Sequence, residues 1–139
     1  AATMSMSRKK IGALIVLERN VHLDDIVASG DTINADINQR LIENIFFKNS
    51  PLHDGAVIIS NHRIKAAGCI LPLSADNAMP KYLGLRHRAA KGMSENSDAI
   101  SVIVSEETGA ISTCVDGDFK LNLTSEDLEK LIADEMAKV

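Results

Sequence analysis

Apolar residues fall in short clusters separated by polar turns, a spacing typical of strands that alternate with short helices. The nearly continuous apolar run at 11–17 predicts a strand that is buried on both faces. Two apolar runs that surround Asn61-His62 predict a hairpin. The complete set of predicted strands is 11–17, 31–37, 56–60, 64–71, 100–105, 110–115 and 119–123.

Helical spacing of apolar residues appears in four further segments: 22–28, 38–47, 84–96 and a terminal helix that opens at Thr124. Asn38 and Thr124 have side chains suited to capping a helix N-terminus. In the terminal helix, the residues predicted to face the core are Leu128, Leu131, Ile132 and Met136. The pattern predicts an α/β fold: a single domain at 10–139 with a mixed central β-sheet flanked by helices, preceded at 1–9 by a linker or vector-derived tail.

Composition narrows the class of protein. Hydrophobic residues make up 45% of the 139 residues but aromatic residues only 3%, so the core must be aliphatic. A formal net charge of -4 argues against nucleic acid as a partner. No apolar run approaches the length of a transmembrane helix. Cys69 and Cys114 each lie inside an apolar run, which favours reduced core cysteines.

The basic triplet Arg86-His87-Arg88 is the first candidate for chemistry. It falls in the first turn of the predicted helix 84–96, where unpaired N–H groups and the helix dipole already favour an anion. Basic side chains are normally unfavourable there, so an external anion such as a phosphate chain would account for them. The alternative is a solvated basic turn that pairs with nearby carboxylates.

A second candidate is His53-Asp54-Gly55-Ala56. Asp54 supplies a carboxylate that can hold a hydroxyl or a metal, His53 is a candidate metal ligand, and Gly55 permits close approach. The alternative is an ordinary Asp-Gly turn, of which Asp116-Gly117 is another example.

Two weaker candidates complete the set. Ser105 and Glu107, in an acidic turn, could reach phosphates or a metal if that turn borders the same cleft. Leu71 precedes Pro72 at the end of a strand, where main-chain groups are free to recognise the edge of a base.

In this order and spacing, the motifs resemble those of the diadenylate cyclase domain, in its membrane-anchored (CdaA/DacA) class. The resemblance extends from Lys10 to about Leu131, and 10–139 would be the catalytic domain. The motifs that carry it are Pro51-Leu52-His53-Asp54-Gly55-Ala56, Leu71-Pro72-Leu73, Gly84-x-Arg86-His87-Arg88-Ala89-Ala90 and Val104-Ser105-Glu106-Glu107-Thr108-Gly109.

The resemblance implies condensation of two ATP molecules into cyclic di-AMP with release of two pyrophosphates, assisted by Mn²⁺, Mg²⁺ or Co²⁺. Asp54 would orient and help deprotonate the attacking ribose hydroxyl, with Gly55 and Ala56 beside it. His53 and Asp54 would hold the metal. The residues implied to bind ATP are Gly55, Ile70, Leu71, Arg86, His87, Arg88, Ser105 and Glu107, of which the basic triplet would also be catalytic.

A symmetric product made from two identical substrates implies a face-to-face homodimer with one site in each chain. The resemblance further implies that the full-length protein is anchored to the cytoplasmic side of the cell membrane by a segment absent here, and that this fragment is soluble. One departure is Leu85, where the family often has Thr. It supports one alternative, a catalytically impaired module that binds ATP or cyclic di-AMP. A second alternative, independent of Leu85, is a structural domain whose basic turn meets an acidic partner.

Overall fold

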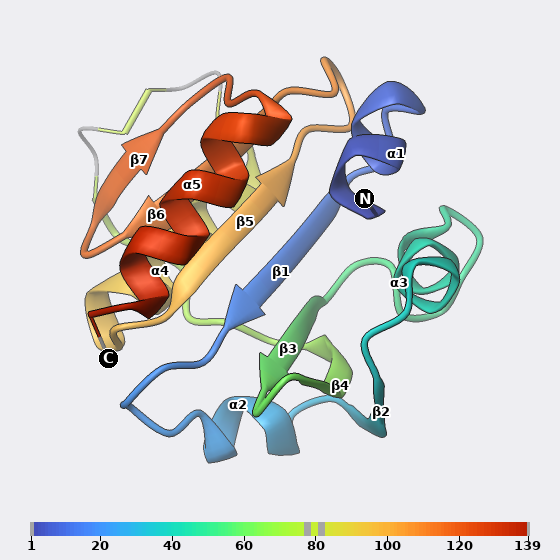
Figure 1. Ribbon diagram of the computed structural model, residues 1–139. Helices are drawn as coiled ribbons and strands as arrows, with labels where there is room; N and C mark the ends of the chain where they lie inside the picture. The colour runs from blue at the N-terminus through green and yellow to red at the C-terminus, as the bar shows by residue number, and fades with distance from the viewer. Residues whose placement is uncertain (1, 77–78, 81–82, 139) are drawn as a thin grey trace.

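The computed structural model describes residues 2–76, 79–80 and 83–138. The described chain contains a seven-stranded sheet in the order β2-β4-β3-β1-β5-β6-β7 (Figure 1). Strands β1 and β3 are parallel, and the other neighbouring pairs are antiparallel, so the sheet is mixed as predicted. The strands are β1 (Ala13–Leu17), β2 (Asp31–Asp36), β3 (Ala56–Ser60), β4 (Arg63–Cys69), β5 (Ile100–Val104), β6 (Ile111–Val115) and β7 (Asp118–Lys120).

Helices cover both faces of the sheet. One face packs against α1 (Ala2–Arg8), α3 (Gln39–Phe46) and α5 (Ser125–Met136), which contribute Met6, Phe46 and Leu128 to one apolar cluster. The other face packs against α2 (Asp24–Ala28) and α4 (Leu85–Asn96), and its cluster includes Ala90 and Met93. Strand β1 lies between the two layers with Ala13 and Val16 fully buried, which explains its unbroken apolar sequence.

Local signals in the sequence determine several element ends. The Asn38 side chain accepts a hydrogen bond from the Leu41 N–H at 3.1 Å and caps α3. Thr124 and Asp127 form a reciprocal capping box at the start of α5. Asn61 and His62 both have positive φ, at 51° and 60°, which matches a tight hairpin turn between β3 and β4.

Three details differ from the expectations. The first residues, for which a linker or vector-derived tail was expected and no helix, contain α1, which buries Met6 completely. Met136 was expected to face the core but is 38% exposed; it is the last residue of α5 and does not pack against the core cluster that Leu131 and Ile132 contact. The strand expected at 119–123 is shorter and forms β7 at Asp118–Lys120.

Two further observations concern the cysteines and the helices. Cys69 and Cys114 are free and buried, as expected for core residues. Within the described residues, none of the helices combines the length and the apolar character that crossing a membrane requires.

The sheet brings the candidate residues to one end. Because β1 and β5 are antiparallel with Ala13 opposite Val104, the start of β1 and the end of β5 lie together. Strand β3 runs parallel to β1 and so begins at this same end, directly after Asp54-Gly55. Helix α4 packs against β1 and β5, and residues of its first turn line the same cavities as these strand ends. Segments far apart in sequence therefore surround one site.

Candidate active site

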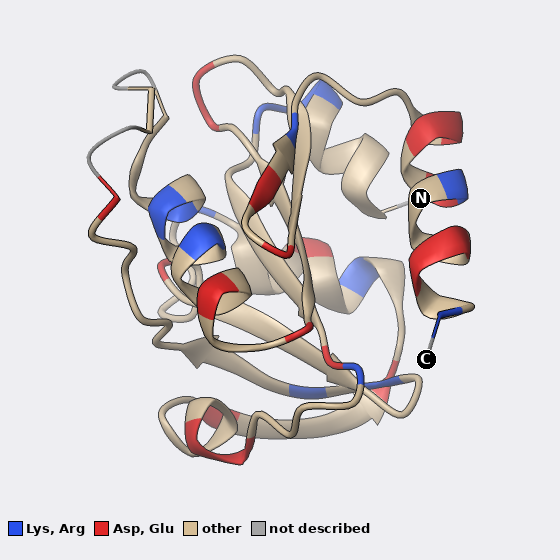
Figure 2. Cartoon of the chain, turned by 90° about the vertical axis from the view of Figure 1, so that its left-hand side faces the viewer, with Lys and Arg blue, Asp and Glu red and all other residues tan. Residues whose placement is uncertain are grey.

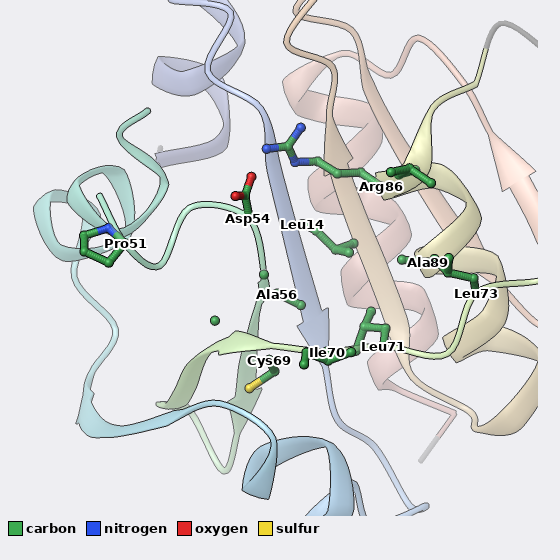
Figure 3. A pocket seen from close by; sticks show the side chains of 13 residues that line it. Leu14, Pro51, Asp54, Ala56, Cys69, Ile70, Leu71, Leu73, Arg86 and Ala89 are labelled. Atoms are coloured by element: carbon green, nitrogen blue, oxygen red, sulfur yellow. The ribbon is translucent and has the colours of Figure 1, made fainter. Parts of the chain in front are cut away.

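An apolar cavity of about 380 Å³ opens between β3, the end of β4 and the start of α4 (Figure 3). Its walls are mostly aliphatic and small side chains, with one carboxylate and one guanidinium at the upper rim in this view. The lining residues are Leu14, Pro51, Asp54, Gly55, Ala56, Gly68, Cys69, Ile70, Leu71, Leu73, Leu85, Arg86 and Ala89.

A polar cleft of about 510 Å³ lies beside it, between the segment before β3, the start of α4 and the turn after β5. It contains cationic, anionic and imidazole side chains. The lining residues are Lys48, His53, Asp54, Gly84, Leu85, Arg86, His87, Ile103, Val104, Ser105, Glu106 and Glu107.

The two hollows share three walls: Asp54, Leu85 and Arg86. A single ligand with an apolar part and an anionic part could therefore extend from one into the other. Figure 3 shows the Asp54 carboxylate and the Arg86 guanidinium near each other at this junction.

Arg86 projects from the first turn of α4 across the start of β1. Its side chain is 21% exposed, and its Nη1 lies 3.7 Å from Glu106 Oε1. The basic residues of α4 lie in the turns at and after its N-terminus, and its acidic residue Glu95 lies near its other end (Figure 2). This distribution opposes the usual preference of the helix dipole, and of the three Lys and Arg residues of α4, Arg86 is the one that lines the polar cleft.

His87 lines the cleft but is only 7% exposed, and its ring lies 6.1 Å from that of Phe119. Burial, together with the neighbouring Arg86 cation, lowers the pKa of His87 below its ordinary value. The imidazole is therefore neutral near pH 7, so it offers a hydrogen-bonding atom rather than a second charge.

Arg88 is directed elsewhere. Its Nη1 donates to the carbonyl oxygens of Ser74 at 2.9 Å and Asp76 at 3.3 Å, and the residue lines neither hollow. Successive helical residues point about 100° apart, so three in a row cannot all face one anion. The structure therefore places Arg88 against the loop after β4 rather than in either hollow, and its predicted contact with phosphate stays a prediction.

His53 and Asp54 form a pair in the polar cleft, and Asp54 also lines the apolar cavity. The His53 Nε2 lies 3.0 Å from Asp54 Oδ1, and its Nδ1 lies 2.7 Å from the Ser50 carbonyl oxygen. If Nδ1–H donates to that carbonyl, Nε2 is left without a proton and faces the Asp54 carboxylate, so two acceptors lie close together. A proton or a cation between these two atoms would stabilise their contact. The Asp54 side chain is 86% exposed and is thus accessible to a ligand.

These two side chains also decide whether the implied metal fits. Within the described residues, no group of three or more His, Cys, Asp or Glu side chains could hold a metal ion. Mg²⁺ and Mn²⁺ in nucleotide sites use one or two protein ligands plus substrate phosphates, rather than a full protein cage. The pair formed by His53 and Asp54 fits an ion of that kind.

The end of β4 shapes the apolar cavity. A side chain at Gly55 would collide with the Gly68 backbone, so this glycine permits the close approach of β4 rather than of a ligand alone. The Ile70 N–H donates to Ser29 Oγ at 2.9 Å, while its side chain is 71% exposed. Burial raises the pKa of Cys69 to about 11, so its thiol is an uncharged part of the wall.

The acidic turn borders the polar cleft, which is the condition under which Ser105 and Glu107 could reach a ligand there. Ser105 Oγ accepts hydrogen bonds from the N–H groups of Glu107 at 3.2 Å and Thr108 at 3.3 Å. A hydroxyl that accepts two bonds keeps its own proton to donate to an anion.

Sequence reasoning missed two polar residues in the cleft. Lys48 follows α3 and lies outside every recognised motif, so no local signal pointed to it. Glu106 lies between two predicted residues, but its contact with Arg86 depends on the packing of β5 beside α4.

An α/β domain with an apolar cavity joined to a polar cleft of charged side chains belongs to the class that accommodates nucleotide-like ligands. Residues 1–119 match the DAC family model, described as DisA bacterial checkpoint controller nucleotide-binding. The chain belongs to this family, which confirms the resemblance in its motifs.

Curated relatives and solved structures agree with this assignment. The chain is 46% identical over 133 residues to the cyclic di-AMP synthase CdaA of Bacillus subtilis, covering 96% of this chain and 49% of the relative. It is 44% identical over 138 residues to a diadenylate cyclase of Listeria monocytogenes, covering 99% and 50%. The chain therefore spans about half the length of these relatives.

Among solved structures, a double mutant of DacA from Staphylococcus aureus superimposes with a TM-score of 0.94 and 46% identity, covering 97% of this chain and 90% of that one. A protein from Bacillus cereus described as a hypothetical membrane spanning protein has a TM-score of 0.85 and 45% identity, covering 88% and 60%. These likenesses confirm the predicted α/β class.

Proposed function

We propose that this domain is a diadenylate cyclase that condenses two ATP molecules into cyclic di-AMP and releases two pyrophosphates. The observation that carries the proposal is the junction of the apolar cavity with the polar cleft at Asp54, Leu85 and Arg86. A nucleoside would occupy the cavity, and its triphosphate would extend into the cleft.

The adenine would lie among Ile70, Leu71 and Ala56 in the apolar cavity. Because the Ile70 N–H is already bonded to Ser29, recognition of the base edge would fall to the main chain of Leu71. The uncharged Cys69 thiol and the small residues Gly55 and Ala56 leave room for a flat ring.

The triphosphate would meet Arg86, the neutral imidazole of His87 and the Ser105 hydroxyl in the polar cleft. A divalent metal held by His53 and Asp54, with Glu107 bordering it, would supply additional charge neutralisation to the phosphates. Transfer of a nucleotidyl group depends mainly on alignment and charge stabilisation, which this set of residues provides.

In each half-reaction, the ribose 3′-oxygen of one ATP attacks the α-phosphorus of the other. The new oxygen–phosphorus bond forms as the bond to the pyrophosphate oxygen breaks, and Asp54 orients the hydroxyl and takes its proton. Repeating the step in the opposite sense closes the ring and releases the second pyrophosphate.

Each chain carries one such site, whereas the reaction needs two ATP molecules facing one another. We therefore propose that the active form is a two-fold symmetric homodimer. The exposed apolar side chains at the cavity rim, Ile70, Leu73 and Leu85, suit contact with a second copy.

Membrane association is proposed for the full-length protein. The support is the Bacillus cereus neighbour described as membrane spanning, together with the fact that this chain spans about half of its curated relatives. The catalytic domain would then act at the cytoplasmic face of the membrane.

The direct test is to incubate the purified chain with ATP and Mn²⁺ at a series of protein concentrations and to measure cyclic di-AMP by chromatography. We expect product, with a specific activity that falls on dilution as the dimer dissociates. A specific activity that stays constant far below the dimerisation constant would refute the dimer requirement.

The same samples separate the alternatives. ATP that raises the melting temperature without product formation would favour the impaired binding module, for which the exposed Leu85 at the junction is the structural reason. No thermal shift with ATP would favour a structural interaction domain.

A further inference from the structure

Gly12 lies immediately before β1, beneath the Arg86 side chain. A Cβ atom at this position would lie 2.7 Å from Arg86 Nη1, 2.8 Å from Cζ and 3.1 Å from Nη2. All three atoms belong to the guanidinium group. The missing side chain at Gly12 therefore creates the space in which this group lies.

Polar contacts restrain the Arg86 guanidinium only weakly. Its Nε is buried and has no hydrogen-bond partner within the described part of the chain. Its ion pair with Glu106 spans 3.7 Å, and that carboxylate is 62% exposed, so solvent screens the attraction. The space over Gly12 is therefore a steric determinant of where the guanidinium lies.

We propose that Gly12 is a positioning residue for Arg86, and that its missing side chain fixes the point at which the guanidinium meets the anionic part of the substrate. The inference rests on the proposed function, since it assigns the phosphate contact to Arg86. Gly12 itself lines neither hollow and acts only through that side chain.

The kind of collision determines the expected phenotype. A Cβ at Gly12 meets the mobile end of a long side chain, so the protein can relieve the overlap by moving Arg86. A Cβ at Gly92 would instead meet the Pro72 main chain, which cannot move without displacing the loop after β4. Gly12→Ala should therefore lose ligand affinity at little cost in stability, whereas Gly92→Ala should lose stability.

The test is a double-mutant cycle with Gly12→Ala, Arg86→Ala and the double variant of the full chain. The probe is 3′-deoxy-ATP with Mn²⁺, which lacks the attacking hydroxyl and so reports binding alone by calorimetry. We expect Arg86→Ala to weaken binding by about tenfold or more, and Gly12→Ala by roughly three- to tenfold, because a charged hydrogen bond is lost or misaligned. In the Arg86→Ala background, the change at Gly12 should cost less than about twofold, since no guanidinium remains to displace.

The outcomes are distinct. Unchanged binding in Arg86→Ala would overturn the assigned phosphate contact, and this inference with it. Weakened binding in Arg86→Ala but parental binding in Gly12→Ala would overturn this inference alone, as would equal losses from Gly12→Ala in both backgrounds. Gly12→Ala could also lower the melting temperature. In that case the inference requires that this decrease in melting temperature is absent when Gly12→Ala is introduced into the Arg86→Ala variant.

Discussion

The apolar cavity and the polar cleft adjoin one another but are built differently. Side chains on regular elements, such as Leu14 on β1, Ala56 on β3 and Ala89 on α4, form much of the cavity. The cleft takes most of its polar groups from connecting segments, including Lys48, His53 and Ser105. Shape is thus held by the rigid sheet, while the reactive groups lie on turns at its end, as is common in enzymes. The two regions should therefore respond differently to substitution, salt and pH.

Loss of the Asp54 carboxylate should have the largest effect, and it should separate chemistry from binding. Asp54→Asn is expected to reduce cyclic di-AMP formation by about 100-fold or more, because a general base is removed. Binding of 3′-deoxy-ATP should survive, since Asn keeps the size of Asp54 and the aliphatic walls of the cavity and Arg86 are unchanged. Asp116→Asn, in the other Asp-Gly turn, is the matched control and should keep full activity. Equal turnover in Asp54→Asn and the parent would refute the role of this carboxylate.

Ionic strength should distinguish a cation in the cleft from an apolar residue at the cavity rim. Lys48→Ala and Leu73→Ala are each expected to weaken nucleotide binding by roughly threefold at low salt. Near 1 M salt the effect of Lys48→Ala should vanish, since the screening length falls to about 3 Å. The loss in Leu73→Ala should persist. Nucleotide titrations of both variants at both salt concentrations measure these losses in affinity. An identical salt response in the two variants would contradict the distinction between a charged cleft and an apolar cavity.

Removing the anion that pairs with Arg86 should have a smaller effect of opposite sign. Glu106→Gln is expected to tighten binding of 3′-deoxy-ATP by about twofold, because an exposed carboxylate no longer competes with phosphate for the guanidinium. Glu107→Gln is the matched comparison and should not tighten binding. Weaker binding in Glu106→Gln would mean that this carboxylate helps to hold the ligand instead.

The buried imidazole of the cleft should make stability depend on pH. Because the pKa of His87 is lowered in the folded state, the unfolded chain takes up its proton first as pH falls. The contribution of His87 to the unfolding free energy should therefore decrease as the pH falls below 6.5, the ordinary pKa of histidine. It should level off once the pH is below the pKa of His87 in the folded state. Urea unfolding between pH 7.5 and 5 should show a smaller loss in His87→Gln than in the parent. His22→Gln, at an exposed site, should behave like the parent, and a parental profile in His87→Gln would refute the effect.

A change remote from both hollows should affect stability alone. Thr124→Ala removes the capping box of α5 and is expected to lower the unfolding free energy by about 1 kcal/mol. Nucleotide affinity should stay at the parental value, because no residue of α5 lines the apolar cavity or the polar cleft. Altered affinity at unchanged stability would show that α5 reaches the site.

Much of the fold could be predicted because local rules and tertiary packing agree. The unbroken apolar run that became β1, the Asn38 cap and the Asn61-His62 turn each gave the correct element. Helix α1 could not be predicted in the same way. Its stability comes from burying Met6 against distant segments, which no local pattern reveals.

The candidate site could be predicted in part. The family motifs identified residues that meet at one end of the sheet, including Asp54, Arg86 and Ser105. The direction of each side chain depends on packing, so the turn of Arg88 toward Ser74 was not foreseeable from sequence adjacency. Lys48 was missed for a related reason: it lies outside the motifs in the sequence, and the folding of the chain brings it to the cleft.

The walls shared by the two hollows have a consequence for inhibition. A compact molecule that fills only the apolar cavity would press against Leu85 and Arg86, which are also walls of the cleft. Such a compound would obstruct the proposed nucleotide without carrying any phosphate of its own. An uncharged inhibitor of this kind avoids the burden of multiple negative charges, which hinders nucleotide analogues from crossing a lipid bilayer.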